Sequence, residues 1–398
     1  MVRADNAVGP DHAAVFRYAA RYVRDADQVT PPATGTLTRS ASIVPLVALI
    51  ALILVWGRGL PPAVEIVVVL LLAGAVLAAV HHAEVVAHRV GEPFGSLILA
   101  VAVTIIEVGL IITLMISGGP GTASLARDTV FAAVMITCNG IAGLSLLVCA
   151  LHRGVAVFNA EGTGAALTTV ITLATLSLVL PAFTTSRPGP QFSGAQLAFA
   201  AVTSLVLYVL FVFVQSVRHR DYFVPVRGAG RRDTAEPDPD EHAASPTARA
   251  ALFSLLLLVV ALVAVVGLAK VESKTIEQVV AGAGLPHTVV GVVIALLILL
   301  PETIAAVRNA RRDRAQISLN LALGSAMASI GLTIPAIAIA SIWLEGPLLL
   351  GLGSTQVVLL ALTAVVGVLT VMPGRATVLQ ATVHLTICSA YLFLAANP

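Results

Sequence analysis

Apolar runs, each close to twenty residues long, recur along almost the whole chain and constrain its fold more than any other feature. A helix needs about 20 apolar residues to cross a bilayer, and in lipid only helices or closed barrels satisfy every backbone polar group. The runs lie near residues 42–57, 61–80, 96–117, 129–151, 165–184, 194–216, 250–269, 287–307, 317–342, 349–371 and 376–395. They predict an all-α, polytopic membrane protein with about eleven transmembrane helices, whose first partner is the lipid bilayer.

The composition excludes a water-soluble domain and argues against a nucleic-acid partner. Hydrophobic residues make up 58% of the chain and charged residues only 11%, which is far less charge than a soluble surface requires. Lys and Arg number 23 and Asp and Glu 21, for a net charge of +2, so no attraction to nucleic acid is expected. The three cysteines fall inside apolar runs and are interpreted as small buried hydrophobes rather than as disulfide partners.

The basic residues predict the orientation of the chain, because cytoplasmic loops of membrane proteins carry an excess of Lys and Arg. With the N-terminus inside, 18 of the 23 Lys and Arg residues fall in cytoplasmic segments and 5 on the opposite side. We therefore expect a multi-pass protein of the bacterial plasma (inner) membrane, with a cytoplasmic N-terminus and an external C-terminus.

One long polar segment divides the predicted spans after the first into five and five. The predicted sections are a cytoplasmic N-terminal tail (1–41), a first transmembrane helix (42–60), a five-helix repeat (61–216), a cytoplasmic linker (217–249) and a second five-helix repeat (250–398). Because five is odd, the second repeat must lie upside down relative to the first. Inverted repeats with a binding site between them near the midplane are a recurring plan of transporters.

Two glutamates, Glu107 and Glu302, are the acidic residues that sit well within predicted spans, each in the second helix of its half. A carboxylate is costly in hydrocarbon and usually marks an ion pathway. Pro301 is expected to break the helix before Glu302, and Gly109 is expected to loosen the helix after Glu107. The alternative is that each glutamate is a protonated structural residue, hydrogen-bonded to a neighbouring helix.

The helices that follow supply further oxygen atoms at matching places in the two halves, Asn139 and Ser325. Carboxylate, amide and hydroxyl oxygens are the ligands that hard cations such as Ca²⁺ or Na⁺ require. For each of these polar residues the alternative role is interhelical hydrogen bonding. Gln380 and His384, one turn apart in the last span, are expected to serve packing.

Two polar clusters lie at predicted cytoplasmic ends of spans. His81, Glu84 and His88 share one helix face, and they are open to three interpretations: transition-metal binding, a gate or proton relay, or polar residues that cost little at a span end. Glu161, in the turn "FNAEGTGAAL", is interpreted as part of a helix cap or of an ion access route.

Several stretches together resemble the bacterial calcium/sodium–proton antiporters of the calcium:cation antiporter superfamily. They are "TIIEVGLIITLM", "MITCNGIAGLSLL", "FNAEGTGAALTTV", "VRHRDYF" and "LPETIAAVRNARRDRAQISLNLALGSAMASIGLTIP". The resemblance implies eleven spans, two inverted repeats after the first span, and exchange of a cytoplasmic cation for external protons. It further implies that Glu107 and Glu302 are the paired acidic residues of the family, and that Asn139 and Ser325 are its small polar ligands.

One departure from the wider superfamily leaves the transported ion open. The acidic residue there commonly follows a Gly-Asn-Ala-x pattern, whereas this chain has "VTIIE" and "ILLPE". Ca²⁺, Na⁺ and K⁺ all remain candidates.

The charge on the two glutamates predicts a mechanism. One Ca²⁺ neutralises both carboxylates and two protons do the same, so each loaded state is neutral and able to rearrange, while the empty dianion is not. The predicted function is secondary active antiport of cytoplasmic Ca²⁺ for external H⁺ by alternating access, with no enzymatic activity and no cofactor.

The alternatives are an Na⁺(K⁺)/H⁺ antiporter using the same glutamates, a cation channel, and an intramembrane metalloenzyme built on His81, Glu84 and His88. No particular oligomeric state is predicted.

Overall fold

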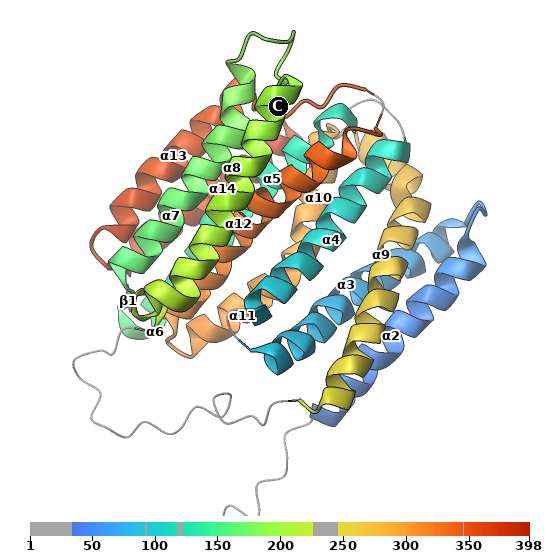
Figure 1. Cartoon of the computed structure of the whole chain (residues 1–398), viewed down its shortest axis with the longest axis horizontal. Helices are drawn as coiled ribbons and strands as arrows, with labels where there is room; N and C mark the ends of the chain where they lie inside the picture. The colour runs from blue at the N-terminus through green and yellow to red at the C-terminus, as the bar shows by residue number, and fades with distance from the viewer. Residues whose placement is uncertain (1–33, 92–93, 118–121, 226–245, 345) are drawn as a thin grey trace, which may run out of the picture. The chain divides into compact units, whose positions relative to one another are not determined.

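The structure is a computed structural model, and it describes residues 34–91, 94–117, 122–225, 246–344 and 346–398 (Figure 1). The predicted N-terminal tail up to residue 33 and the linker residues 226–245 lie outside the described residues. Residues 41–398 pack as one unit.

Helices account for most of the described chain. Those before the linker are α2 (Thr34–Val55), α3 (Pro62–Val90), α4 (Phe94–Ser117), η1 (Thr122–Ser124), α5 (Leu125–Met135), the π-helix η2 (Ile136–Ile141), α6 (Ala142–Arg153), α7 (Ala160–Ala174), η3 (Thr175–Val179), η4 (Leu180–Ala182), α8 (Gly194–Phe213), η5 (Val214–Arg218) and η6 (Arg220–Phe223). Those after it are α9 (Ala248–Gly282), α10 (Thr288–Ile298), α11 (Leu300–Arg311), α12 (Ala315–Ala340), α13 (Ser354–Val371) and α14 (Val378–Ala396).

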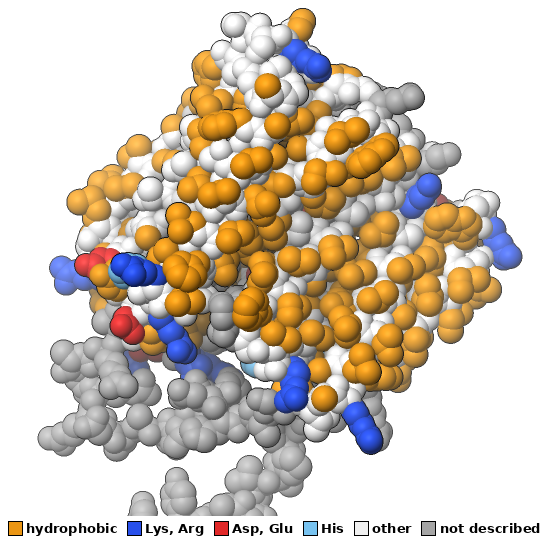
Figure 2. Space-filling view, viewed as in Figure 1, with side chains coloured by type: hydrophobic (Ala, Val, Ile, Leu, Met, Phe, Trp, Pro, Cys, Tyr) orange, Lys and Arg blue, Asp and Glu red, His pale blue; other side chains and the backbone are white. Residues whose placement is uncertain are grey.

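The predicted all-α, polytopic architecture is confirmed. Within the described residues, nine helical stretches are long and apolar enough to cross a membrane, and the bent pair α10–α11 makes a tenth. The first predicted span corresponds to a shorter apolar helix, Ala41–Val55. Figure 2 shows hydrophobic side chains over most of the visible face, with Lys and Arg only near its edges, as a surface in contact with lipid requires.

The two halves of the chain interlock through reciprocal contacts. The second helix of the first half, α4, packs on α12, the third helix of the second half; in return, α10 packs on α5, which begins the third span of the first half. The fifth helices follow the same rule, because α8 packs on α12 and α14 packs on α6. Such an exchange of equivalent contacts is what two repeats related by a pseudo-two-fold axis would produce.

The apolar core consists of two clusters that meet at the second helix of each half. One cluster joins α2, α3, α4, α9 and α10, and the other joins α5–α8 with α10–α14. Residues of α4 and α10 belong to both clusters, for example Ile106 and Ile111 of α4. The helices predicted to carry the site therefore lie where the two clusters join.

Two short connections near one end of the bundle form features that the sequence did not predict. Strands β1 (Val155–Val157) and β2 (Arg375–Thr377) pair antiparallel, so the turn after α6 is tied to the turn before α14. The predicted linker also starts later than residue 217. The helical turn η6 packs against the bundle, with Phe223 buried and its carbonyl accepting a 2.7 Å hydrogen bond from Asn320 Nδ2.

Candidate cation-binding site

A cavity of about 250 Å³ lies among α4, α8, α10, α11 and α12, and both Glu107 and Glu302 line it. Its other lining residues with polar side chains are Thr104, Tyr208, Gln215, Asn320, Ser325 and Ser329. The two glutamates come from the second helical segment of each half. The fold therefore brings together, in one cavity, two carboxyl groups that lie far apart in the sequence.

Glu107 sits on α4, at the face that packs against α12. Its side chain is only 3% exposed. One carboxyl oxygen, Oε1, accepts a 2.6 Å hydrogen bond from Ser329 Oγ of α12. Small residues on this stretch of α12, including Gly324 and Ala328, also line the cavity, and they let the two helices approach closely. Glu107 is thus buried and oriented by a neighbouring helix.

Glu302 lies at a break between two helices. The chain bends by 52° between α10 and α11, and Pro301 occupies the start of α11, where proline fits because the first N–H groups of a helix have no intrahelical partner. Glu302 follows in the first turn of α11, a position that favours a negative charge. Its Oε2 is buried and has no hydrogen-bond partner among the described residues, which makes it available to a proton or a cation.

The expectation that Gly109 breaks or loosens its helix is wrong. Helix α4 continues through Gly109 from Phe94 to Ser117. A Cβ atom at Gly109 would lie 2.6 Å from Cγ2 of Val266 on α9. The glycine therefore serves close packing between α4 and α9, and only the α10–α11 side of the site contains a break.

Asn139 and Ser325, predicted as equivalent ligands, are separated by the structure. Ser325 lines the cavity, whereas Asn139, fully buried in the π-helix η2, is directed to α13 and α14. Its Nδ2 donates to Thr363 Oγ1 at 2.9 Å, and its Oδ1 lies 3.0 Å from Nδ1 of His384. Both polar atoms are thus engaged away from the cavity, and the expectation of a matched Asn139 ligand is not met in this structure.

His384 has a larger role than the packing predicted for it. Besides its bond to Asn139, its Nε2 lies 3.2 Å from Thr370 Oγ1, so the ring links η2, α13 and α14. The signal was present in the sequence, because an ionisable residue within a span seldom lacks a specific partner.

The interpretation of His81, Glu84 and His88 as a metal site is wrong. Glu84 and His88 are exposed near the end of α3, and the part of the chain that the structure describes holds no group of three or more His, Cys, Asp or Glu side chains suited to a metal ion. The neighbouring His82 is buried instead and lies 3.0 Å from the carbonyl of Ala41. Helix α3 contacts α11, which carries Glu302, and the gate or proton-relay interpretation of this cluster stays a prediction.

Glu161 lies in the first turn of α7 and is exposed. The residue that caps this helix is Asn159, whose side chain accepts hydrogen bonds from the backbone N–H groups of Glu161 and Gly162 at 2.9 and 3.1 Å. Neither Asn159 nor Glu161 lines the cavity. The predicted cap is therefore present, but Asn159 provides its acceptor.

Two carboxyl groups in a cavity between interlocked, membrane-spanning halves define a secondary ion transporter as the class of this protein. The chain belongs to the sodium/calcium exchanger protein family, whose sequence profile matches residues 60–217 and 253–396. These two matched segments coincide closely with the two predicted repeats. The protein is accordingly a cation exchanger, and the predicted resemblance to cation antiporters is confirmed.

Individual relatives agree with this assignment. The y4hA protein of Sinorhizobium fredii is 49% identical over 333 residues, covering 82% of this chain and 87% of that protein. The sodium-potassium/proton antiporter ChaA of Escherichia coli is 32% identical, covering 88% of this chain and 94% of its own length. The solved structures of native YfkE and of the H⁺/Ca²⁺ exchanger CAX each cover 91% of this chain, and 99% and 93% of their own chains, with TM-scores of 0.67 and 0.66. At 15% and 16% identity, these structures demonstrate a shared fold.

Proposed function

We propose that this protein exchanges cytoplasmic Ca²⁺ for external H⁺ by alternating access, with Glu107 and Glu302 binding either the cation or protons. The observation that carries the proposal is the cavity lined by both carboxyl groups. Membership in an exchanger family supports cation exchange in general terms. The finer points, which ion is carried and by which residues, follow from the chemistry of the cavity.

Charge provides the coupling between the two transported species. Carboxylates close together in a low-dielectric interior repel each other and each favours a positive partner. One Ca²⁺ or two protons neutralise the pair, and only a neutral site moves through the apolar protein at low cost. Because both ligands use the same oxygens, one must leave before the other binds, and the proton gradient drives cation extrusion.

The cavity contains the kind of oxygen atoms that Ca²⁺ requires. Calcium takes about six to eight oxygen ligands, of which carboxylates are the strongest. Around Glu107 and Glu302, the hydroxyl groups of Thr104, Ser325 and Ser329 line the cavity. Water or main-chain carbonyls can complete the shell, and the unpartnered Oε2 of Glu302 can bind without breaking a hydrogen bond.

The position of the cavity supports a state that is open toward the cytoplasm. Its lining on α12 begins at Ile317, close to Arg314, and its lining on η5 ends at Gln215, close to Arg218. These are helix ends rich in arginine, which the positive-inside rule assigns to the cytoplasm. The cation thus reaches the glutamates from the cytoplasmic side in this conformation.

A second candidate is Na⁺(K⁺)/H⁺ exchange through the same cavity. The observation in its favour is the E. coli relative, a sodium-potassium/proton antiporter that covers 88% of this chain. A monovalent ion neutralises only one carboxylate, so the other would have to keep a proton in the loaded state. The two candidates therefore differ in stoichiometry but share the residues of the site.

Inside-out membrane vesicles with an acidic interior, monitored with a pH-sensitive dye, test the proposal. Ca²⁺, Na⁺ and K⁺ are added in turn to wild type, to Glu302→Gln and to Glu161→Gln, which removes an exposed acidic group outside the cavity. We expect Ca²⁺ to discharge the gradient in wild type and in Glu161→Gln but not in Glu302→Gln. Discharge by Na⁺ or K⁺ alone would select the second candidate. Flux of a cation with no movement of protons would identify a channel, and would refute the exchange mechanism.

A further inference from the structure

A second cavity, of about 300 Å³, lies at the start of α13 and beside α14. Its polar lining comes from Arg127, Thr288, the helix-start residues Ser354, Thr355 and Gln356, and Tyr391. Neither Glu107 nor Glu302 lines it. Nothing in the exchange mechanism described so far makes use of this space.

The two cavities are lined by the fifth helices of the two halves in the same pattern. In the first half these lining residues are Tyr208, Phe211, Val212 and Gln215. In the second half they are Tyr391, Leu394, Ala395 and Pro398. Both sets begin with a buried tyrosine and continue at positions i+3, i+4 and i+7. In its fifth-helix lining, the second cavity therefore matches the first under the exchange of the two halves.

Helices α5 and α10 connect the two cavities. On α5, Arg127 lines the second cavity and Ala133 the first; on α10, Thr288 lines the second and Ala295 the first. At the 1.5 Å rise per residue of an α-helix, these lining residues lie about 9 Å apart along α5 and about 10.5 Å apart along α10. Along α5 and α10, the second cavity thus follows the cavity that contains the glutamates. It lies farther from the arginine-rich helix ends near Arg218 and Arg314.

Two contacts lie between the levels of the two cavities. A Cβ atom at Gly291 of α10 would lie 2.9 Å from backbone atoms of Asp128 and Thr129, so α5 and α10 touch there. The rings of Phe131 and Tyr391 meet edge to face, with centroids 5.4 Å apart. We call these contacts at Gly291 and between Phe131 and Tyr391 the neck.

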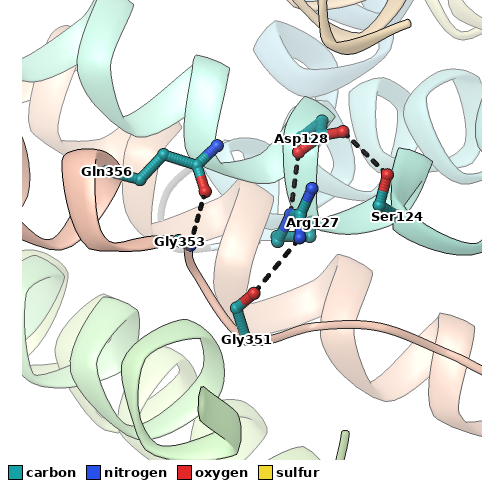
Figure 3. Close-up of polar contacts among 6 residues, drawn as sticks. All are labelled: Ser124, Arg127, Asp128, Gly351, Gly353 and Gln356. Carbon is teal, nitrogen blue, oxygen red and sulfur yellow. Dashed lines mark hydrogen bonds and ion pairs between the residues drawn. The ribbon is translucent and has the colours of Figure 1, made fainter. Parts of the chain in front are cut away.

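A polar tie at the rim of the second cavity holds one side of the neck in place. Figure 3 shows Asp128 bound to Arg127 and Ser124, and Arg127 reaching the loop before α13. Asp128 Oδ1 is 2.8 Å from Arg127 Nε, its Oδ2 accepts from Ser124 Oγ at 3.0 Å, and Arg127 donates to the Gly351 carbonyl at 3.3 Å. Because Asp128 also contacts Gly291, the tie and the neck share one residue.

We infer that the second cavity is the outward end of the ion route, which receives the exchanged cation and protons on the external side when the neck opens. This inference rests on the proposed exchange function and extends it, by assigning the residues of the outer path and of its closure. Opening requires α5 and α10 to separate at Gly291 and the Tyr391 ring to leave Phe131. When α5 and α10 separate, the ion pair of Arg127 with Asp128 and the hydrogen bond from Arg127 to the Gly351 carbonyl break or move with α5.

Labelling of single cysteines from each side of the membrane tests the inference. In a variant whose three native cysteines are replaced by alanine, Leu394→Cys probes the second cavity and Phe211→Cys the equivalent place in the first. The adjacent residues Phe393 and Leu210, exposed on the outer surface of the helices, give the matched controls Phe393→Cys and Leu210→Cys. The probe is a membrane-impermeant methanethiosulfonate reagent, with labelling measured by mass spectrometry and exchange measured before and after reaction.

We expect the reagent to modify Leu394→Cys from the external side with loss of exchange, and Phe211→Cys from the cytoplasmic side. Phe393→Cys and Leu210→Cys should keep their exchange activity. Thr355→Cys, at an exposed position of the same cavity, repeats the test if Leu394→Cys does not fold. Modification of Leu394→Cys from the cytoplasmic side, or full exchange after its modification, would overturn the inference. Failure of the proposed function would look different. The unlabelled protein would then show no exchange of Ca²⁺ for protons, while the sidedness of labelling would stay as expected.

Discussion

The helices that carry the two glutamates present the same group in unlike surroundings. Glu107 lies on an unbroken helix, almost fully buried, and its carboxyl group is held by Ser329 of α12. Glu302 follows a 52° break, in the first turn of a new helix, and one of its oxygens has no partner among the described residues. One half therefore holds its carboxylate by a hydrogen bond, while the other half leaves a carboxylate oxygen available to bind a cation or proton.

The largest expected effect comes from removing either charge. Glu107→Gln and Glu302→Gln keep the size of the side chain, but neither variant can form the neutral, cation-loaded site. Loss of a group that only orients a cation ligand typically costs 10–100-fold, so we expect loss of a carboxylate that binds the cation itself to reduce exchange by at least about 100-fold in both variants. Vesicle exchange assays measure this, with Glu161→Gln as the control.

The same two variants test whether both glutamates bind the cation. If Glu302→Gln loses exchange and Glu107→Gln retains most of it, Glu107 is a structural residue bonded to Ser329 and Glu302 alone carries the ion. Equal losses, together with loss of Ca²⁺ binding to the purified protein in both variants, would establish a shared site.

A smaller effect is expected from removing the hydrogen bond that orients Glu107. Ser329→Ala deletes the donor to Oε1, and a hydrogen bond to a charged group is worth about 1.5–3 kcal/mol. We expect the apparent affinity for the cation to fall about 10- to 100-fold, with the maximal rate less affected. Ser325→Ala is the matched comparison, because Ser325 lines the same cavity without a hydrogen bond to either glutamate in the described structure. A larger effect of Ser325→Ala would identify Ser325 as a direct ligand and Ser329 as dispensable.

The sequence was sufficient to predict the features that depend on local chemistry. The apolar runs predicted the spans, because twenty apolar residues have few other uses. Glu107 and Glu302 stood out since a carboxylate in a span is costly. The break beside Pro301 follows from the missing N–H of proline. None of these inferences requires knowledge of a distant neighbour.

The predictions that were wrong or incomplete depend on neighbours far along the chain. Gly109 is next to Glu107 in sequence, but its role is set by Val266 of α9. Asn139 matches Ser325 in position, yet the π-helix η2 adds an extra residue to a turn and changes the face on which Asn139 lies. Its partners Thr363 and His384 come from the last two helices, and no local pattern in the sequence connects them.

A moderate effect on stability is expected at Asn139. Asn139→Ala leaves the Thr363 hydroxyl and the His384 ring without their buried partner, at a cost of about 1–3 kcal/mol. Unfolding of the purified protein measures the loss, and a double-mutant cycle with Thr363→Val should show a coupling of at least about 0.5 kcal/mol. We expect the apparent cation affinity to stay unchanged. A fall in affinity comparable to that of Ser329→Ala, at unchanged stability, would show that Asn139 visits the cavity and restore its equivalence with Ser325.

The smallest expected effect is on the stability of the protein and comes from Gly109 in the unbroken helix α4. Gly109→Ala places a Cβ atom 2.6 Å from Val266 Cγ2. Because a single side-chain methyl group is in the way, α4 and α9 can adjust, and we expect a loss of about 1 kcal/mol in the free energy of unfolding. Val266→Ala should rescue the variant, since it removes the atom that the new Cβ meets. Gly324→Ala, where no atom lies within 4 Å in the described structure, is the stability control and should be neutral or stabilising. If Gly109→Ala is as neutral as Gly324→Ala and yet impairs exchange, the glycine serves the movement of α4 rather than its packing, and both glutamate helices would then have to bend during transport.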